Sequence, residues 1–169
     1  MLHIAGINYE STADAEGVAC TIFFSGCKHY CKGCYSKDTW DFNYGKEATD
    51  ELIGIINSEI DKRPFLSALV LSGGDPMYSA AEIKKFISKI HIPKNNVWCY
   101  SGFLMEQIKE NYEMKELLDL CNVLVDGEFE LDKRDITLSF RGSSNQRIWR
   151  KRNGEWYLLQ QNEIKNLKT

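Results

Sequence analysis

Residues 17–35 read GVACTIFFSGCKHYCKGCY and join an apolar run to a loop that carries three cysteines. Residues 17–24 are rich in β-branched and aromatic side chains and end near a glycine, which predicts a buried strand. Cys27, Cys31 and Cys34 follow at C-x3-C-x2-C spacing, close enough for their thiolates to share one metal centre. Because iron–sulfur clusters are usually held by four thiolates, three would leave one iron open to a substrate.

Zinc is the alternative use of this loop, in a Cys3His site with His29 as the fourth ligand. His29 lies between two of the cysteines and not at the spacing of a zinc finger, so the pattern favours an iron–sulfur cluster. Lys28, Lys32 and Gly33 indicate an exposed loop, where core cysteines seldom gather. The remaining cysteines are scattered and are predicted to pack in the core, as free cysteines usually do: Cys20, Cys99 and Cys121.

The composition is that of a globular protein of 169 residues, with 43% apolar and 27% charged residues. No apolar run approaches the roughly 20 residues that cross a bilayer, and the N-terminus lacks the features of a signal peptide. We therefore expect a cytoplasmic protein without a membrane partner, in which thiols stay reduced. The net charge is −3, yet residues 133–169 carry nine Lys or Arg against three acids. This basic tail is either a solvated face or a docking surface for an acidic partner; without a recognised motif, no nucleic acid is expected.

Strand and helix patterns alternate along the first 126 residues. An amphipathic helix is predicted over 48–62, a buried strand over 68–71, and a helix from Ser79, whose side chain forms a capping box with Glu82. Further strands are predicted over 97–100 and 123–125, and between them a helix over 103–120 with a break near Asn111. Beyond this point residues 136–140 alternate, and Asn153-Gly154 predicts a hairpin turn.

The alternation predicts an α/β fold: a partial, open (β/α) barrel of parallel strands with a C-terminal β-hairpin extension. A complete eight-fold barrel needs about 250 residues, more than this chain has. We expect one domain over residues 1–169, with a core of about 17–126 and a basic extension over 127–169.

Glycine-rich or polar turns follow the C-terminal ends of the successive predicted strands, and this edge of such sheets carries their sites. Gly73 and Gly74 follow one strand directly, where the missing Cβ lets the backbone approach a ligand. Together with the cysteine loop they predict a cofactor pocket. Asp126, at the end of another strand, has two interpretations, as a contact to a cofactor or cation or as a turn-forming residue before Gly127.

With these two motifs in place, the sequence resembles the radical S-adenosylmethionine superfamily. The three cysteines match its cluster motif, and SGGDP (72–76) matches its GGE/DP motif. The similarity is closer still to the family of activating proteins of anaerobic ribonucleoside-triphosphate reductases. The segments GCKHYCKGCY (26–35), VWCYSG (97–102), VDGEF (125–129) and FRGSSNQR (140–147) resemble signatures of that family. The similarity covers residues from about 18 to 149.

This resemblance implies an oxidoreductase in which Cys27, Cys31 and Cys34 hold one 4Fe–4S cluster, whose open iron binds S-adenosyl-L-methionine. Electron transfer would cleave that cofactor and yield a 5′-deoxyadenosyl radical, which takes a hydrogen atom from a glycine of the large subunit of the reductase. A flavodoxin- or ferredoxin-type protein is the implied electron donor. Residues implied to contact S-adenosylmethionine, besides Cys34, are Gly33, Tyr35, Gly73, Gly74, Asp75, Ser101 and Asp126.

Two other functions remain open from the sequence. One is another small radical S-adenosylmethionine enzyme, which activates a different glycyl radical protein or acts on a small molecule such as a deazaguanine precursor. The VDGEF and FRGSSNQR segments argue against it. The other is a zinc-binding interaction module that docks through the basic tail.

Overall fold

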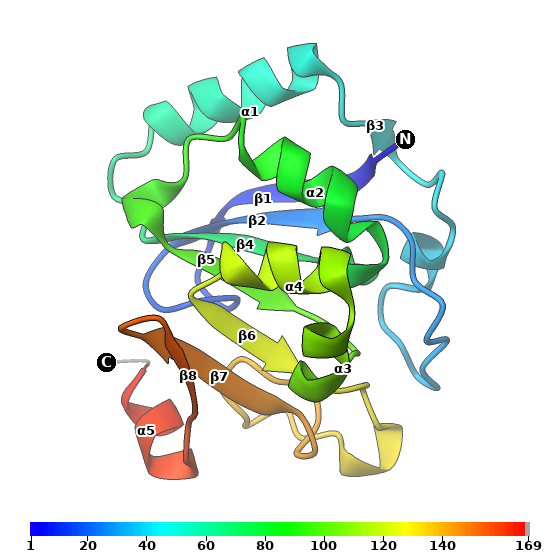
Figure 1. The fold of residues 1–169 in the computed structure, drawn as a ribbon, viewed down its shortest axis with the longest axis vertical. Helices are drawn as coiled ribbons and strands as arrows, with labels where there is room; N and C mark the ends of the chain where they lie inside the picture. Colours follow the sequence, from blue (N-terminus) through cyan, green and yellow to red (C-terminus); the bar gives the residue numbers. More distant parts are fainter. Residues whose placement is uncertain (168–169) are drawn as a thin grey trace.

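One open sheet organises the protein. A computed structural model describes residues 1–167, in which eight strands form this sheet (Figure 1). In sheet order the strands are β3 (Lys46–Glu47), β1 (His3–Ser11), β2 (Ala19–Phe24), β4 (Ala68–Gly73), β5 (Val97–Tyr100), β6 (Val123–Asp126), β7 (Arg147–Arg152) and β8 (Glu155–Leu158). The strands β3 and β8 lie at the two edges.

The centre of the sheet is parallel and its flanks are antiparallel. The parallel pairs are β2 with β4, β4 with β5, and β5 with β6. On one side β1 pairs antiparallel with β2, and on the other β7 pairs antiparallel with β6. The mixed α/β fold, the open sheet and the C-terminal hairpin are thus confirmed, whereas the partial barrel stays a prediction.

Helices connect the parallel strands and pack on one face of the sheet. They are α1 (Asp50–Asp61), α2 (Ala80–Ile87), α3 (Met105–Glu110) and α4 (Tyr112–Asp119), while α5 (Gln161–Asn166) follows the hairpin. Ile56 of α1, Ile83 of α2 and Leu117 of α4 are fully buried in one core with Leu69 and Leu71 of β4. None of the helices within residues 1–167 has both the length and the hydrophobicity needed to span a membrane.

The opposite face of the sheet is covered by irregular chain and by α5. Because side chains alternate along a strand, Val70 of β4 and Trp98 of β5 point to this second core. Phe140, from the segment between β6 and β7, packs its ring against Trp98 with centroids 5.1 Å apart. Ile164 of α5 is buried in the same core. The C-terminal extension therefore completes the fold by closing this face.

Some helices begin with the caps or breaks that the sequence predicts, and others do not. The Thr49 hydroxyl accepts a hydrogen bond from the Leu52 N–H at 3.2 Å and caps α1. The predicted break at Asn111 is confirmed, since its side chain caps α4. Ser79 makes no capping hydrogen bond at the start of α2, so the predicted capping box is wrong. Residues 136–140 form no strand, and β1 and α5 have no counterpart among the predicted elements.

Candidate metal centre

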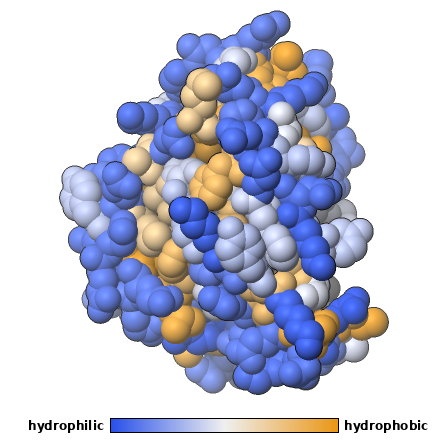
Figure 2. All heavy atoms as spheres, turned by 90° about the vertical axis from the view of Figure 1, so that its right-hand side faces the viewer, coloured by the Kyte–Doolittle hydropathy of each residue, from blue (hydrophilic) through white to orange (hydrophobic). Residues whose placement is uncertain are grey.

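The C-terminal ends of the four parallel strands surround one cavity of about 170 Å³. This edge faces the right-hand side of Figure 1, and Figure 2 shows that side, with weakly polar and apolar residues in its middle and hydrophilic residues around them. The loop after β2 and the turns after β4, β5 and β6 all contribute to the wall. The lining residues are Cys27, His29, Cys31, Cys34, Trp40, Ser72, Gly73, Gly74, Tyr100, Ser101, Gly102, Gly127, Phe129 and Gln146.

All three loop cysteines are free thiols in the wall of this cavity. Cys27 is buried, and burial raises the pKa of its thiol to about 11, against an opposing effect from a hydrogen bond with the His29 backbone. Burial also raises the pKa of the half-buried Cys31 thiol, which a hydrogen bond with the Phe129 backbone partly offsets. Both thiols thus favour the protonated form until a metal replaces the proton.

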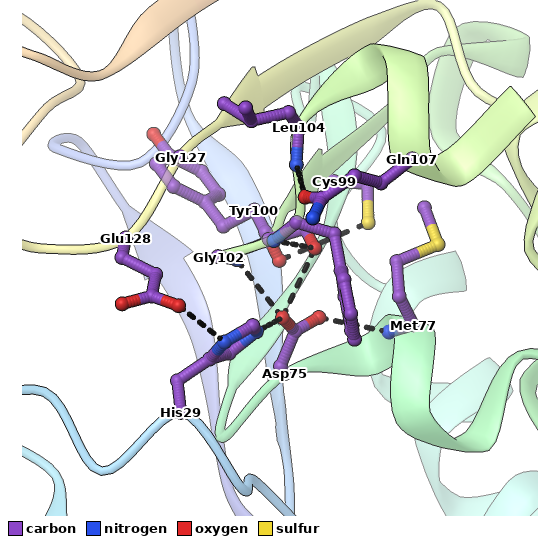
Figure 3. A network of polar contacts seen from close by, with 12 residues as sticks. His29, Asp75, Met77, Cys99, Tyr100, Gly102, Leu104, Gln107, Gly127 and Glu128 are labelled. Carbon is purple, nitrogen blue, oxygen red and sulfur yellow. Dashed lines mark hydrogen bonds and ion pairs between the residues drawn. The ribbon is translucent and has the colours of Figure 1, made fainter.

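His29 is held between two carboxylates, as Figure 3 shows. Its Nε2 lies 2.7 Å from Asp75 Oδ2, and its Nδ1 lies 3.1 Å from Glu128 Oε1. The ring also packs against Phe103, with centroids 4.7 Å apart, and against Tyr78 at 5.2 Å. Burial lowers the pKa of His29, but the two carboxylates outweigh it and raise the pKa overall. An imidazolium with both N–H groups satisfies both contacts, because carboxylates only accept.

Asp75 links the turns after β4 and β5 to the cysteine loop. Its side chain is buried, and its Oδ2 accepts hydrogen bonds from the Ser101 hydroxyl at 3.0 Å and the Gly102 N–H at 2.9 Å, in addition to His29. Its Oδ1 accepts from the Met77 N–H at 2.9 Å and so caps the short 3-10 helix Pro76–Ser79. We call His29, Asp75, Ser101, Gly102 and Glu128 the His29 network.

Gly73 and Gly74 bring the turn after β4 against the end of β2. A Cβ on Gly73 would lie 2.3 Å from the Phe24 carbonyl oxygen, and one on Gly74 would lie 2.7 Å from that of Gly26. The Gly74 N–H donates to the Phe24 carbonyl at 2.8 Å. Glycine is therefore required here because two backbone segments lie in contact. The prediction from the sequence instead explained these glycines by the close approach of the backbone to a ligand. Both nevertheless line the cavity.

The donors around the cavity fit an iron–sulfur cluster better than a mononuclear ion. The three free thiols that line the cavity are the type of ligand that four-iron clusters use. His29 uses both ring nitrogens on carboxylates, so it is not available as the fourth ligand of a Cys3His zinc site.

The structure brings together six of the ten predicted site residues. The cavity is lined by Cys27, Cys31, Cys34, Gly73, Gly74 and Ser101. The other four lie outside its wall. Gly33 packs against Leu131, Tyr35 is fully exposed beside a separate hollow, and Asp75 belongs to the His29 network.

Asp126 is the fourth residue outside the wall. Its side chain is completely buried, and its oxygens accept hydrogen bonds from Arg147 at 3.0 and 2.6 Å and from the Met105 N–H at 2.7 Å. It thereby joins the end of β6 to β7 and to the start of α3. Because these partners occupy both carboxylate oxygens, the geometry favours a structural role for Asp126 over a contact to a cofactor or cation.

Several residues of the site were not predicted as such. The His29 network joins residues up to 99 positions apart, and only the family-like segments GCKHYCKGCY and VDGEF place both His29 and Glu128 near function. The rest of the wall is supplied by Trp40, Ser72, Tyr100, Gly127, Phe129 and Gln146. All of these except Trp40 fall within the segments that resemble known motifs, whereas nothing in the sequence marks Trp40.

The sequence that forms this cysteine-lined cavity matches a known family. Residues 13–149 match the family model described as a 4Fe-4S single cluster domain, which defines the class of the protein. The chain is 39% identical over 141 residues to the anaerobic ribonucleoside-triphosphate reductase-activating protein of Salmonella typhimurium, an alignment that spans 79% of this chain and 88% of that protein.

Two more distant relatives carry the same name. The protein of Pasteurella multocida is 35% identical over 142 residues, 81% of this chain and 90% of its own. That of Enterobacteria phage T4 is 33% identical over 147 residues, 85% of this chain and 90% of its own. The chain belongs to the family of anaerobic ribonucleoside-triphosphate reductase-activating proteins.

Proposed function

We propose that this protein activates an anaerobic ribonucleoside-triphosphate reductase by generating a glycyl radical on its large subunit, with S-adenosylmethionine as the cosubstrate. The observation that carries the proposal is one cavity walled by Cys27, Cys31 and Cys34 and by Gly73 and Gly74. The names of its relatives supply the target. A bound 4Fe–4S cluster would supply the electron that cleaves S-adenosylmethionine.

The residues of this chain bind and orient the reactants. The thiolates of Cys27, Cys31 and Cys34 would hold the cluster, one fewer than the four thiolates that usually hold one. Backbone carbonyls around Gly73 and Gly74 would accept hydrogen bonds from the ammonium group of the methionyl moiety. Tyr100 and Phe129 also line the cavity, where they would limit the access of water to the bound reactants.

The wider interactions are also part of the proposal. A flavodoxin- or ferredoxin-type protein delivers the electron, and the reductase places its glycine at the mouth of the cavity. In the basic extension, Lys151 and Arg152 lie on β7, near the opposite edge of the sheet from β1.

The proposal is tested by cofactor content and by cleavage of S-adenosylmethionine. After anaerobic reconstitution we expect about four iron and four sulfide per chain. With dithionite, the protein should convert S-adenosylmethionine to 5′-deoxyadenosine and methionine, and each single Cys27→Ala, Cys31→Ala or Cys34→Ala variant should not. Stoichiometric zinc, with no cleavage by the reconstituted protein, would overturn the proposal in favour of an interaction module.

A further inference from the structure

The loop that carries the three cysteines has a basic outer surface. Residues 26–37 contain Lys28, Lys32 and Lys37 and no Asp or Glu, although the whole chain has a net charge of −3. All three lysines are exposed, and their loop runs along the right-hand side of Figure 1, at the outer edge of the sheet. We propose that these lysines form the docking surface for an acidic one-electron carrier protein, which reduces the cluster from outside the cavity.

The three lysines have no acidic partner within the protein. Ion pairs of lysine within residues 1–167 are formed by Lys62, Lys84, Lys89 and Lys133. The segment after β6 packs against the cysteine loop, but its acids are engaged elsewhere: Glu128 contacts His29 at 3.1 Å, and Glu130 pairs with Lys133 at 2.6 Å. The ammonium groups of the loop are therefore available to the acids of a partner.

Aromatic rings restrain two of these ammonium groups. The Nζ of Lys28 lies 5.5 Å from the centroid of the Phe42 ring, and that of Lys37 lies 6.0 Å from the centroid of a ring of Trp40. A cation over the face of an aromatic ring is attracted to it. Because the side chains are already restrained, less conformational entropy is lost when a partner binds them.

Trp40 also connects this surface to the cavity. It lines the cavity together with the three cysteines, and Tyr30 packs edge-on against it with ring centroids 5.2 Å apart. Tyr30 is 61% exposed, so the two rings extend from the surface of the protein to the cavity wall. Lys32 directly follows Cys31 in the sequence. A carrier bound to the lysines therefore lies next to the cysteines, and its electron, unlike the glycine of the reductase, does not have to enter the cavity.

The step moves one electron and no atoms. The reduced carrier is oxidised by one electron, and the cluster held by the three cysteines is reduced by one. The inference rests on the proposed use of these cysteines as cluster ligands, and it does not depend on which protein is activated.

The test measures the binding of an oxidised, acidic flavodoxin to the reconstituted protein by isothermal titration calorimetry, at about 0.02 M and about 0.5 M salt. It compares the wild type with the loop variant Lys28→Gln/Lys32→Gln/Lys37→Gln. The matched control, Lys85→Gln/Lys109→Gln/Lys115→Gln, removes the same charge from exposed positions on α2, α3 and α4.

At low salt we expect the loop variant to raise the Kd for flavodoxin about 10-fold, because attraction between opposite charges speeds association by about 10- to 1000-fold. The control should stay within about 2-fold of the wild type. At high salt all three proteins should bind alike, since screening then acts within a few ångströms. In stopped-flow measurements the loop variant should also be reduced about 10-fold more slowly by reduced flavodoxin, but not by the methyl viologen radical, a small cation.

Equal weakening of binding by the loop variant and the control would attribute the effect to net charge and overturn the docking surface. A loss that persists at high salt would also overturn it. Slower reduction by methyl viologen would show that the cluster, and not docking, is altered. Weaker binding of the large subunit of the reductase, with unchanged binding of flavodoxin, would assign the surface to the reductase and overturn the inference.

If the loop variant does not fold, Lys32→Gln replaces it, because Lys32 is exposed on the same loop. This single change should raise the Kd for flavodoxin about 2- to 5-fold at low salt, and an unchanged Kd would overturn the inference. Binding of flavodoxin is measured without S-adenosylmethionine and without the reductase. The absence of a radical on the reductase would therefore count against the proposed function and leave these results unaffected.

Discussion

The six cysteines fall into two groups with different surroundings. Cys27, Cys31 and Cys34 line the cavity at the end of the parallel strands, whereas Cys20, Cys99 and Cys121 are fully buried in the core beneath the helices. Spacing in the sequence already separates these groups, since ligands of one metal centre can lie on one loop. Burial of the second group confirms the predicted core packing.

Substitution should reveal this difference. Any one of Cys27→Ala, Cys31→Ala or Cys34→Ala should lose the cluster and all cleavage of S-adenosylmethionine. Cys99→Ala should keep the cluster and lose roughly 0.5–3 kcal/mol of unfolding free energy, because it leaves a small void in the core. Iron content and thermal denaturation measure the two effects. A folded Cys99→Ala protein without any activity would show that Cys99 takes part in the chemistry.

Gly102 and Gly54 provide a matched pair of glycine substitutions. A Cβ on Gly102 would meet the His29 ring at 2.6 Å, whereas one on Gly54, in the exposed face of α1, would meet nothing within 4 Å. Gly102→Ala should displace His29 and cost roughly 1–3 kcal/mol of stability. Gly54→Ala should add about 0.5–1 kcal/mol, since alanine suits a helix interior better. Urea denaturation of both variants checks the signs; equal effects would contradict the packing described around His29.

At the scale of the elements, the N-terminal caps distinguish helices α2 and α4. Asn111 accepts a hydrogen bond from the Met114 N–H at 3.0 Å at the start of α4, while the Ser79 side chain makes no such bond at the start of α2. We expect Asn111→Ala to cost about 1 kcal/mol of unfolding free energy. Ser79→Ala should change it by less than about 0.5 kcal/mol. A larger loss from Ser79→Ala than from Asn111→Ala in chemical denaturation would refute this assignment of the caps.

The sequence predicts the parallel elements well because each has a strong local pattern. The run ALVL at 68–71 is apolar enough to read as a buried strand, and it lies within β4. By contrast, β1 contains Gly6, Asn8 and Glu10 and is mostly half-exposed, so no apolar pattern marks it. The capping box at Ser79 fits the residue types and fails because the Ser79 backbone adopts a conformation that makes no capping bond.

The sequence predicts the cysteines of the site but not the residues that surround them. Three cysteines on one loop carry their own signal, whereas contact between His29 and Glu128 depends on the packing of the whole sheet edge. The same holds for Asp126, whose partner Arg147 follows it by 21 residues. Local sequence patterns cannot report such contacts, because they depend on how distant turns meet.

At the scale of the whole molecule, the extension after β6 is part of the sheet. Ile148 of β7 is fully buried, and Arg147 neutralises the buried Asp126. Removing one partner of a buried ion pair costs about 3–5 kcal/mol, a large share of the 5–15 kcal/mol that stabilises a typical domain.

Truncation after residue 146 should therefore abolish cooperative unfolding, and the full chain should unfold in a single transition. Circular dichroism during heating measures both. Cooperative melting of residues 1–146 at the temperature of the full chain, or two transitions in the full chain, would contradict the proposal of one domain.

The most direct test of the central claim is electron paramagnetic resonance of the reduced, reconstituted protein mixed anaerobically with S-adenosylmethionine and the large subunit of an anaerobic ribonucleoside-triphosphate reductase. We expect a glycyl doublet that collapses when the reductase carries glycine deuterated at Cα, because the splitting comes from that hydrogen. No signal should form with Cys31→Ala. Absence of the doublet, with an intact and reducible cluster and with S-adenosylmethionine still cleaved, would contradict the proposed activation of this reductase.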